Sequence, residues 1–142
     1  MKTRVITLLL ALLLLCLPLV ACRDQVERIG SWEDATYLSD EEFGKGERTV
    51  QVEVKADDQS ITFTIHTDKD TLADAMLEHE LIEGEDGPYG LFLDKVNGIS
   101  IPTDSGYYWG LYQDGEMTPV GISSIEIADG DHYELVKTNV FE

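Results

Sequence analysis

Apolar and polar residues alternate strictly along two neighbouring segments in the first half of the chain. Residues 50–54 read Val-Gln-Val-Glu-Val, and residues 61–65 read Ile-Thr-Phe-Thr-Ile. A period of two predicts strands with one buried face and one polar face. Because Asp57 and Asp58 supply turn residues between the two segments, we expect an antiparallel hairpin.

The period changes to that of a helix after residue 70. Within residues 71–81, Leu72 and Met76 fall on one helical face, which predicts a short helix with one buried side. Gly84 is expected to end this helix. Residues 84–88 are rich in turn-forming residues and predict a loop.

The remaining sequence is typical of short strands joined by tight turns. We predict strands over 91–96, 107–112 and 133–138, with Asn97-Gly98 as a type I′ hairpin turn. No segment repeats at a fixed period, so a single domain is the simplest interpretation. The order of hairpin, helix and strands predicts an α+β fold, β-grasp-like, with one helix packed on a mixed or antiparallel sheet.

The N-terminus has the order of segments found in an export signal. Lys2 and Arg4 precede the apolar run Val5–Leu15, and small residues follow. A membrane-spanning helix needs about 20 apolar residues, whereas Pro18 interrupts this run. We therefore predict a signal peptide over residues 1–21.

The predicted signal ends in a sequence that resembles a lipobox. In Leu19-Val20-Ala21-Cys22, the small residue Ala21 precedes a cysteine, so Cys22 is expected to become the lipid-carrying first residue of an exported protein. Cys16 would leave with the signal, so no disulfide is possible in the mature chain. We expect residues 22–47 to form a lipidated polar tether, whose aromatics either dock or stay mobile, and residues 48–142 to form the domain.

Charge narrows the range of partners. The chain carries 28 acidic and 10 basic residues, a net charge of −18. Removal of Lys2 and Arg4 would make the mature chain more acidic still. Such a charge repels nucleic acid, which we exclude as a partner. Calcium, a cationic ligand and a basic partner remain open, and solubility of an exported protein explains much of the charge.

Few residues carry a pattern typical of catalysis. The nearest group is His66, Asp68, Asp70, Glu78 and His79, but neighbouring helix positions 78 and 79 point about 100° apart. A solvated polar rim is therefore preferred to a metal site. Asp129-Gly130-Asp131-His132 lacks the further carboxylates of a calcium loop and predicts a plain turn. We expect no enzyme activity, no metal and no resident cofactor.

An aromatic strand is the most informative feature. Tyr107 and Trp109 should face one side of this strand, and Tyr108 and Tyr112 the other. Tyr and Trp with polar tips commonly line ligand surfaces. Trp109 fits either a core anchor or a contact residue, whereas tyrosines beside Gly/Pro loops favour contact. The candidate ligand-binding residues are Tyr89, Gly90, Tyr107, Tyr108, Trp109 and Tyr112.

The order of several motifs over residues 49–138 resembles the transcobalamin C-terminal-like domain, a family of unknown function found in bacterial lipoproteins. The matching motifs are Thr71-Leu72-Ala73-Asp74-Ala75-Met76-Leu77, Gly87-Pro88-Tyr89-Gly90, Val96-Asn97-Gly98-Ile99, Tyr108-Trp109-Gly110-Leu111-Tyr112, Asp114-Gly115 and Asp129-Gly130-Asp131 before Tyr133-Glu134-Leu135. The resemblance implies a β-grasp-like domain of the type that closes over one face of cobalamin in transcobalamin and intrinsic factor, with Tyr108 and Trp109 at the ligand face. Unlike those carriers, this chain has no helical barrel domain.

Two functions follow as hypotheses. The first is a noncatalytic small-molecule-binding lipoprotein, lipid-anchored to the outer face of the bacterial cell membrane and accessory to nutrient uptake, with cobalamin or another corrinoid as candidate ligand. The alternative is a protein-interaction module that docks on a transporter or another surface protein.

Overall fold

The computed structural model describes residues 28–142, most of which lie in strands or tight turns. The predicted signal peptide and Cys22 lie outside the described residues. The elements are η1 (Trp32–Asp34), β1 (Glu41–Gly44), β2 (Arg48–Ala56), β3 (Gln59–Thr67), α2 (Leu72–Leu77), β4 (Ile82–Gly87), β5 (Gly90–Val96), β6 (Ile99–Ser100), β7 (Tyr107–Gln113), β8 (Glu116–Met117), η2 (Ile122–Ser124) and β9 (His132–Asn139).

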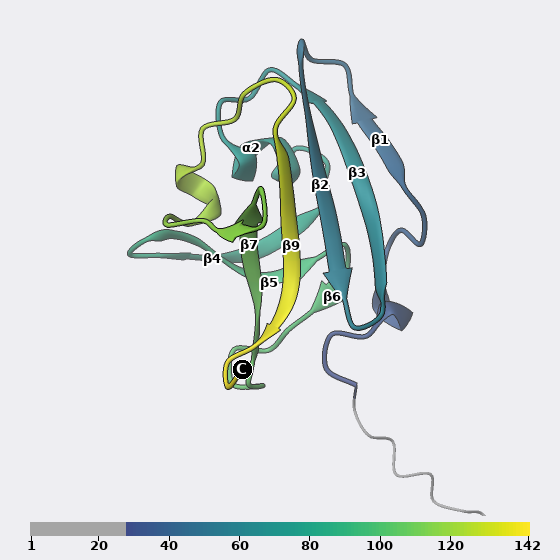
Figure 1. Cartoon of the computed structure of the whole chain (residues 1–142), viewed down its shortest axis with the longest axis vertical. Helices are drawn as coiled ribbons and strands as arrows, with labels where there is room; N and C mark the ends of the chain where they lie inside the picture. Colours follow the sequence, from purple (N-terminus) through teal and green to yellow (C-terminus); the bar gives the residue numbers. More distant parts are fainter. Residues whose placement is uncertain (1–27) are drawn as a thin grey trace, which may run out of the picture.

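The strands form two sheets. The larger has the order β1-β3-β2-β9-β7-β8, and the smaller has the order β4-β5-β6. In Figure 1 the smaller sheet crosses behind β9 and β7, in a sandwich-like arrangement. The prediction of an α+β, β-grasp-like fold with one helix on a single sheet was therefore wrong, because the protein is mainly β with two sheets.

The correction arises largely from residues 82–87, most of which were predicted to be a loop. They form β4, which pairs antiparallel with β5 and carries a register shift between Glu83 and Gly84. A Cβ at Gly84 would collide with the Phe92 carbonyl oxygen, so glycine here permits close strand approach. Gly84 is thus a strand residue and does not end the helix.

The β2–β3 hairpin forms as its alternating pattern predicts. Val50 pairs with Ile65, and Val52 with Phe63; all four side chains are fully buried. Burial of such a side chain contributes about 1.5–3 kcal/mol relative to exposure. This buried face, together with Leu135 of β9, forms the floor of the core.

The single described α-helix is shorter than predicted. The Thr71 hydroxyl accepts from Asp74 N at 3.2 Å, which caps the first turn. Glu80 then adopts a positive φ of 55°, and Leu81 N donates to Met76 O at 3.0 Å. These are features of a Schellman-type ending, so α2 stops at Leu77.

The described part of the predicted tether is packed against the domain. β1 pairs in parallel with β3, and Trp32 is 7% exposed while its Nε1 donates to Ala56 O at 2.6 Å. Phe43 packs edge-on against Tyr37 and Phe63, with ring centroids 5.3 and 5.6 Å away. The aromatics of this segment are therefore docked.

Asn97 connects this N-terminal segment to the smaller sheet. Its Oδ1 accepts from Tyr37 N and its Nδ2 donates to Tyr37 O, both at 2.9 Å, in a buried position. Its backbone carbonyl also accepts from Thr36 N at 2.8 Å, and its N–H donates to Leu81 O at 2.8 Å. The positive φ of Asn97 and of Gly98, 52° and 77°, fits the predicted type I′ turn.

We predict that Asn97→Ala destabilises the protein by about 3 kcal/mol, because two hydrogen bonds are lost and the Tyr37 backbone groups stay partly buried without partners. Asp114→Ala is the matched control, since Asp114 occupies the same left-handed turn position at φ 53° but is exposed. Its expected cost is about 1 kcal/mol, from backbone strain alone. Urea unfolding measures both; equal losses would show that the side-chain bonds of Asn97 are unimportant.

Candidate functional site

Strand β7 presents different residues to the two faces of the larger sheet. Trp109 and Leu111 are 7% and 8% exposed and face the smaller sheet. Tyr112 alternates with them and faces outward, since it pairs with Glu134 on β9. The alternation of side chains along the predicted aromatic strand is therefore present, and Trp109 lies on the inner side.

An apolar cavity of about 170 Å³ lies between β5, β7 and the segment leading into η2. Trp109 is a buried core residue and also forms part of the cavity wall. The lining residues are Leu91, Phe92, Leu93, Tyr108, Trp109, Leu111, Gly121 and Ile122.

The indole N–H of Trp109 has no acceptor in the described part of the chain, although Nε1 is buried. Trp32, by contrast, satisfies its Nε1 with a backbone carbonyl. A buried unpaired donor costs about 1–3 kcal/mol. Trp109 therefore combines an unsatisfied buried donor with a place in the cavity wall.

A second hollow of about 490 Å³ adjoins the first and shares Gly121 with it. Its residues come from the β4–β5 turn and from the loop before η2: Pro88, Tyr89, Gly90, Pro119, Val120, Gly121 and Ser124. Tyr89, at the tip of the hairpin, is 91% exposed. We call the two hollows together the β5–β7 site.

Ser123 fixes the wall between the hairpin and η2. Its hydroxyl accepts from Leu91 N at 3.0 Å. Gly90 has a φ of 98°, and a Cβ there would lie 2.8 Å from the Ser123 Cβ. Gly90 therefore contributes a close backbone approach, in a conformation that other residues rarely adopt.

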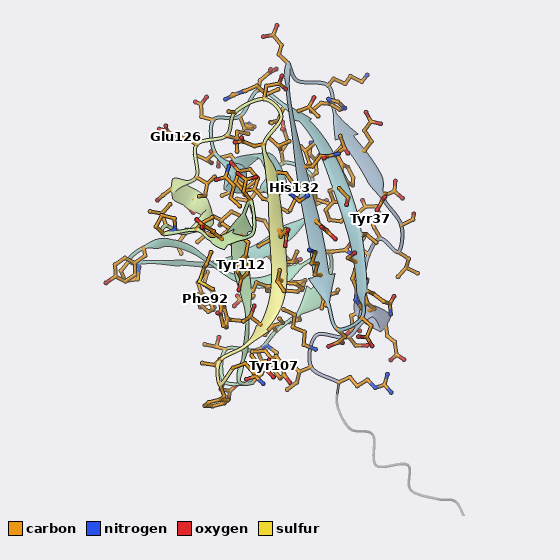
Figure 2. All side chains as sticks on the ribbon, viewed as in Figure 1. Tyr37, Phe92, Tyr107, Tyr112, Glu126 and His132 are labelled. Carbon is orange, nitrogen blue, oxygen red and sulfur yellow. The ribbon has the colours of Figure 1, made fainter. Side chains whose placement is uncertain are left out.

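Four of the six predicted ligand-binding residues line the β5–β7 site, namely Tyr89, Gly90, Tyr108 and Trp109. The other two line neither hollow. Figure 2 places Tyr107 near the C-terminal end of the molecule, where Lys137 Nζ lies 5.0 Å from the centre of its ring. Tyr112 lies on the outer sheet face, and its ring approaches Gly110.

Sequence reasoning missed the aliphatic walls of the site. Leu91 and Leu93 belonged to a predicted buried strand, but nothing in their pattern placed them opposite Trp109. Val120 and Ile122 lie in a segment for which no element was predicted. The Pro119–Gly121 turn was the available signal, because Gly/Pro loops commonly carry binding residues.

The predicted His and Asp group surrounds a separate hollow, and most of its members contact neighbouring groups, whereas His79 Nε2 is buried without a hydrogen-bond partner among the described residues. A hollow of about 420 Å³ there includes His66, Asp68, Glu78 and His79. His66 Nε2 lies 2.6 Å from Glu42 Oε1, and the Asp68 carboxylate accepts from Glu47 N. Within residues 28–142, no three His, Cys, Asp or Glu side chains are arranged to hold a metal ion.

The Asp129–His132 segment forms a turn whose carboxylates stabilise the backbone. Asp129 Oδ1 accepts from Thr49 N at 2.7 Å, and Asp131 Oδ2 accepts from Ala128 N and from the Tyr133 hydroxyl. Burial is the main cause that raises the pKa of Tyr133, and the hydrogen bond to Asp131 raises it further. Gly130 takes the predicted positive φ, here 87°.

Over residues 28–142, no helix is long and apolar enough to cross a membrane.

Comparisons with known proteins give a family model and two similar folds. Residues 69–134 match the model of the Domain of unknown function (DUF4430), and no curated protein sequence matches the chain. A candidate metal-binding protein from Ruminococcus gnavus is 26% identical with a TM-score of 0.63, over 66% of this chain and 98% of its own. Haptocorrin in complex with Cbi is 16% identical with a TM-score of 0.56, over 68% of this chain and 26% of haptocorrin. Together these similarities support a transcobalamin-like fold.

Proposed function

We propose that this domain is a noncatalytic binding module that takes a small molecule at the β5–β7 site. The observation that carries the proposal is the buried, unpaired N–H of Trp109 in the wall of an apolar cavity. Ligand sites commonly combine apolar walls with a few fixed polar groups. A suitable ligand would present an apolar body and a hydrogen-bond acceptor.

The candidate ligand class is the corrinoids. The support is the fold shared with haptocorrin, whose structure contains Cbi, together with the amide acceptors at the edge of a corrin ring. The chain spans 26% of haptocorrin, so this domain would contact one face or edge of such a ligand and leave the rest for another protein or for solvent. Partial coverage suits capture and transfer better than permanent storage.

We do not extend metal binding from the Ruminococcus gnavus protein to this chain. Metal binding is attributed to that protein alone. Within residues 28–142 of this chain, no three His, Cys, Asp or Glu side chains lie close enough together to hold a metal ion. His66 Nε2 is engaged with Glu42, whereas the His79 ring stacks on Phe43 and its Nε2 has no hydrogen-bond partner among the described residues.

We also propose that Cys22 carries a lipid that anchors the protein at the outer face of the bacterial cell membrane, where it assists nutrient uptake. The support is the lipobox-like sequence that ends at Cys22, together with the basic residues Lys2 and Arg4 before the apolar run. Two acyl chains at about 0.8 kcal/mol per buried CH₂ give stable membrane attachment.

A protein-docking surface is the alternative function. The favouring observation is the exposure of Tyr89, Phe92 and Val120 around the site, at 91%, 50% and 46%. Exposed apolar groups gathered near a hollow often mark interaction sites. Cross-linked partners recovered from intact cells, and lost in Tyr89→Ala, would favour docking on a transporter or another surface protein.

We predict that cobinamide or cobalamin quenches the tryptophan fluorescence of the signal-free protein, which comes from Trp32 and Trp109, in a saturable manner. Trp109→Phe removes one hydrogen-bond donor, so the Kd measured by calorimetry should rise about tenfold, or about 1.4 kcal/mol. Tyr107→Phe is the control, because Tyr107 lies beside Lys137 away from the site. Absence of both heat and quenching would reject corrinoids; equal effects of the two variants would reject the location.

We predict that Cys22→Ala moves the protein from the membrane fraction to the soluble fraction and abolishes incorporation of labelled palmitate. The physical reason is the loss of the sulfur that carries the acyl chains. Cys16→Ala is the matched control, since it removes the other cysteine and preserves the apolar run. Membrane retention of Cys22→Ala would contradict the proposed anchor.

A further inference from the structure

The charges near the β5–β7 site are almost all of one sign. Residues 82–131 supply the smaller sheet, β7, β8 and η2, and they contain ten Asp and Glu residues, one lysine, and no arginine or histidine. That lysine, Lys95, pairs with Glu83 at 3.0 Å. The segments that build the site therefore offer no unpaired cation to an anionic ligand.

Three cations on other elements of the domain are engaged with neighbouring groups. Lys137 Nζ donates to Asp57 and to the Ile29 carbonyl, at the end of the molecule near Tyr107. Lys55 bridges Glu53 and Glu134 on the outer face of the larger sheet. Arg48 contacts Asp70 at 3.3 Å. These groups are positioned to satisfy neighbouring carboxylates and carbonyls.

Two carboxylates stand directly opposite residues that line the cavity. In the β4–β5 hairpin, Asp86 pairs with Leu91 and Glu85 pairs with Phe92. Both carboxylate residues are exposed. Partners in antiparallel strands lie about 5 Å apart and point to the same face. A ligand in the cavity would therefore lie within the field of at least one of these groups.

Acidic residues alone would not indicate a ligand, but Trp109 supplies an independent observation. This side chain is more than nine-tenths buried, it lines the cavity, and its N–H has no acceptor in the described residues. A ligand with a neutral acceptor that reaches this N–H would satisfy it. The exposed rings of Tyr89 and Phe92 can additionally attract a cation through their π faces.

We propose that the β5–β7 site selects ligands with an apolar body, a neutral hydrogen-bond acceptor and a positive charge, and disfavours ligands that carry phosphate or carboxylate. The inference rests on the proposed small-molecule function and specifies its ligand chemistry. Among corrinoids, a cationic form without a phosphodiester would bind in preference to one that carries it.

A matched pair of probes tests charge selection. N-(2-aminoethyl)-1-naphthamide and N-(2-carboxyethyl)-1-naphthamide share a ring and an amide acceptor, but they carry opposite charges. We expect the cationic probe to bind the signal-free protein about tenfold more tightly at low salt, because two exposed carboxylates each contribute a modest amount. The preference should shrink as salt screens the charges.

Variants locate the effect. The double variant Glu85→Gln/Asp86→Asn should reduce the preference to about twofold, while the control Asp58→Asn/Glu142→Gln should leave it unchanged. The control removes the same net charge from exposed positions at the β2–β3 turn and the C-terminus, which Figure 1 shows away from the β4–β5 hairpin. Ligand-observed NMR and calorimetry measure the affinity of each double variant for each of the two probes, alongside the unsubstituted protein.

Each outcome has a distinct meaning. Equal affinity for the two probes would overturn charge selection but leave the proposed binding function standing. An equal loss of preference in both double variants would overturn its assignment to the β5–β7 site. Failure of both probes to bind would overturn the inference, whereas saturable corrinoid quenching of tryptophan fluorescence would still support the function.

Discussion

The side chain of Asn97 joins the smaller sheet to the N-terminal segment that leads into β1 of the larger sheet. This buried side chain accepts from Tyr37 N and donates to Tyr37 O. The backbone N–H of Asn97 donates to the carbonyl oxygen of Leu81, which follows the helix. The N-terminal segment, the end of α2 and the β5–β6 turn are thereby held at one point. β5 ends at this turn and begins at the site, so Asn97 follows directly on the strand that supplies Leu91 and Leu93 to the cavity wall.

Buried polar donors in the core have acceptors, whereas the buried indole donor at the candidate site has none in the described residues. Trp32 and Tyr133 are buried, and each donates to an acceptor within the chain. Trp109 is equally well buried but keeps an unpaired donor beside an apolar cavity. Proteins satisfy most buried donors, so this exception beside a cavity is the observation on which the proposed binding function depends. The acidic hairpin beside it adds a preference about charge.

Local patterns predicted the parts of the fold that depend on neighbouring residues. The alternation at 50–54 and 61–65 predicted a real hairpin, and Asn97-Gly98 adopts the two positive φ values that its turn requires. The fold class was wrong because turn-forming residues at 84–87 were assigned to a loop. Their pairing with β5 depends on a partner strand and on the space that Gly84 leaves for the Phe92 carbonyl.

The sequence by itself determined the periodicity, the tight turns, the acidic balance and the lipobox-like segment before Cys22, because these depend on residues close together in the chain. It also grouped Tyr89, Gly90, Tyr108 and Trp109 as candidates. Only the tertiary structure separated them from Tyr107 and Tyr112, since alternation fixes which residues share a face but not which element covers that face. The packing of β5 and η2 against β7 decided this.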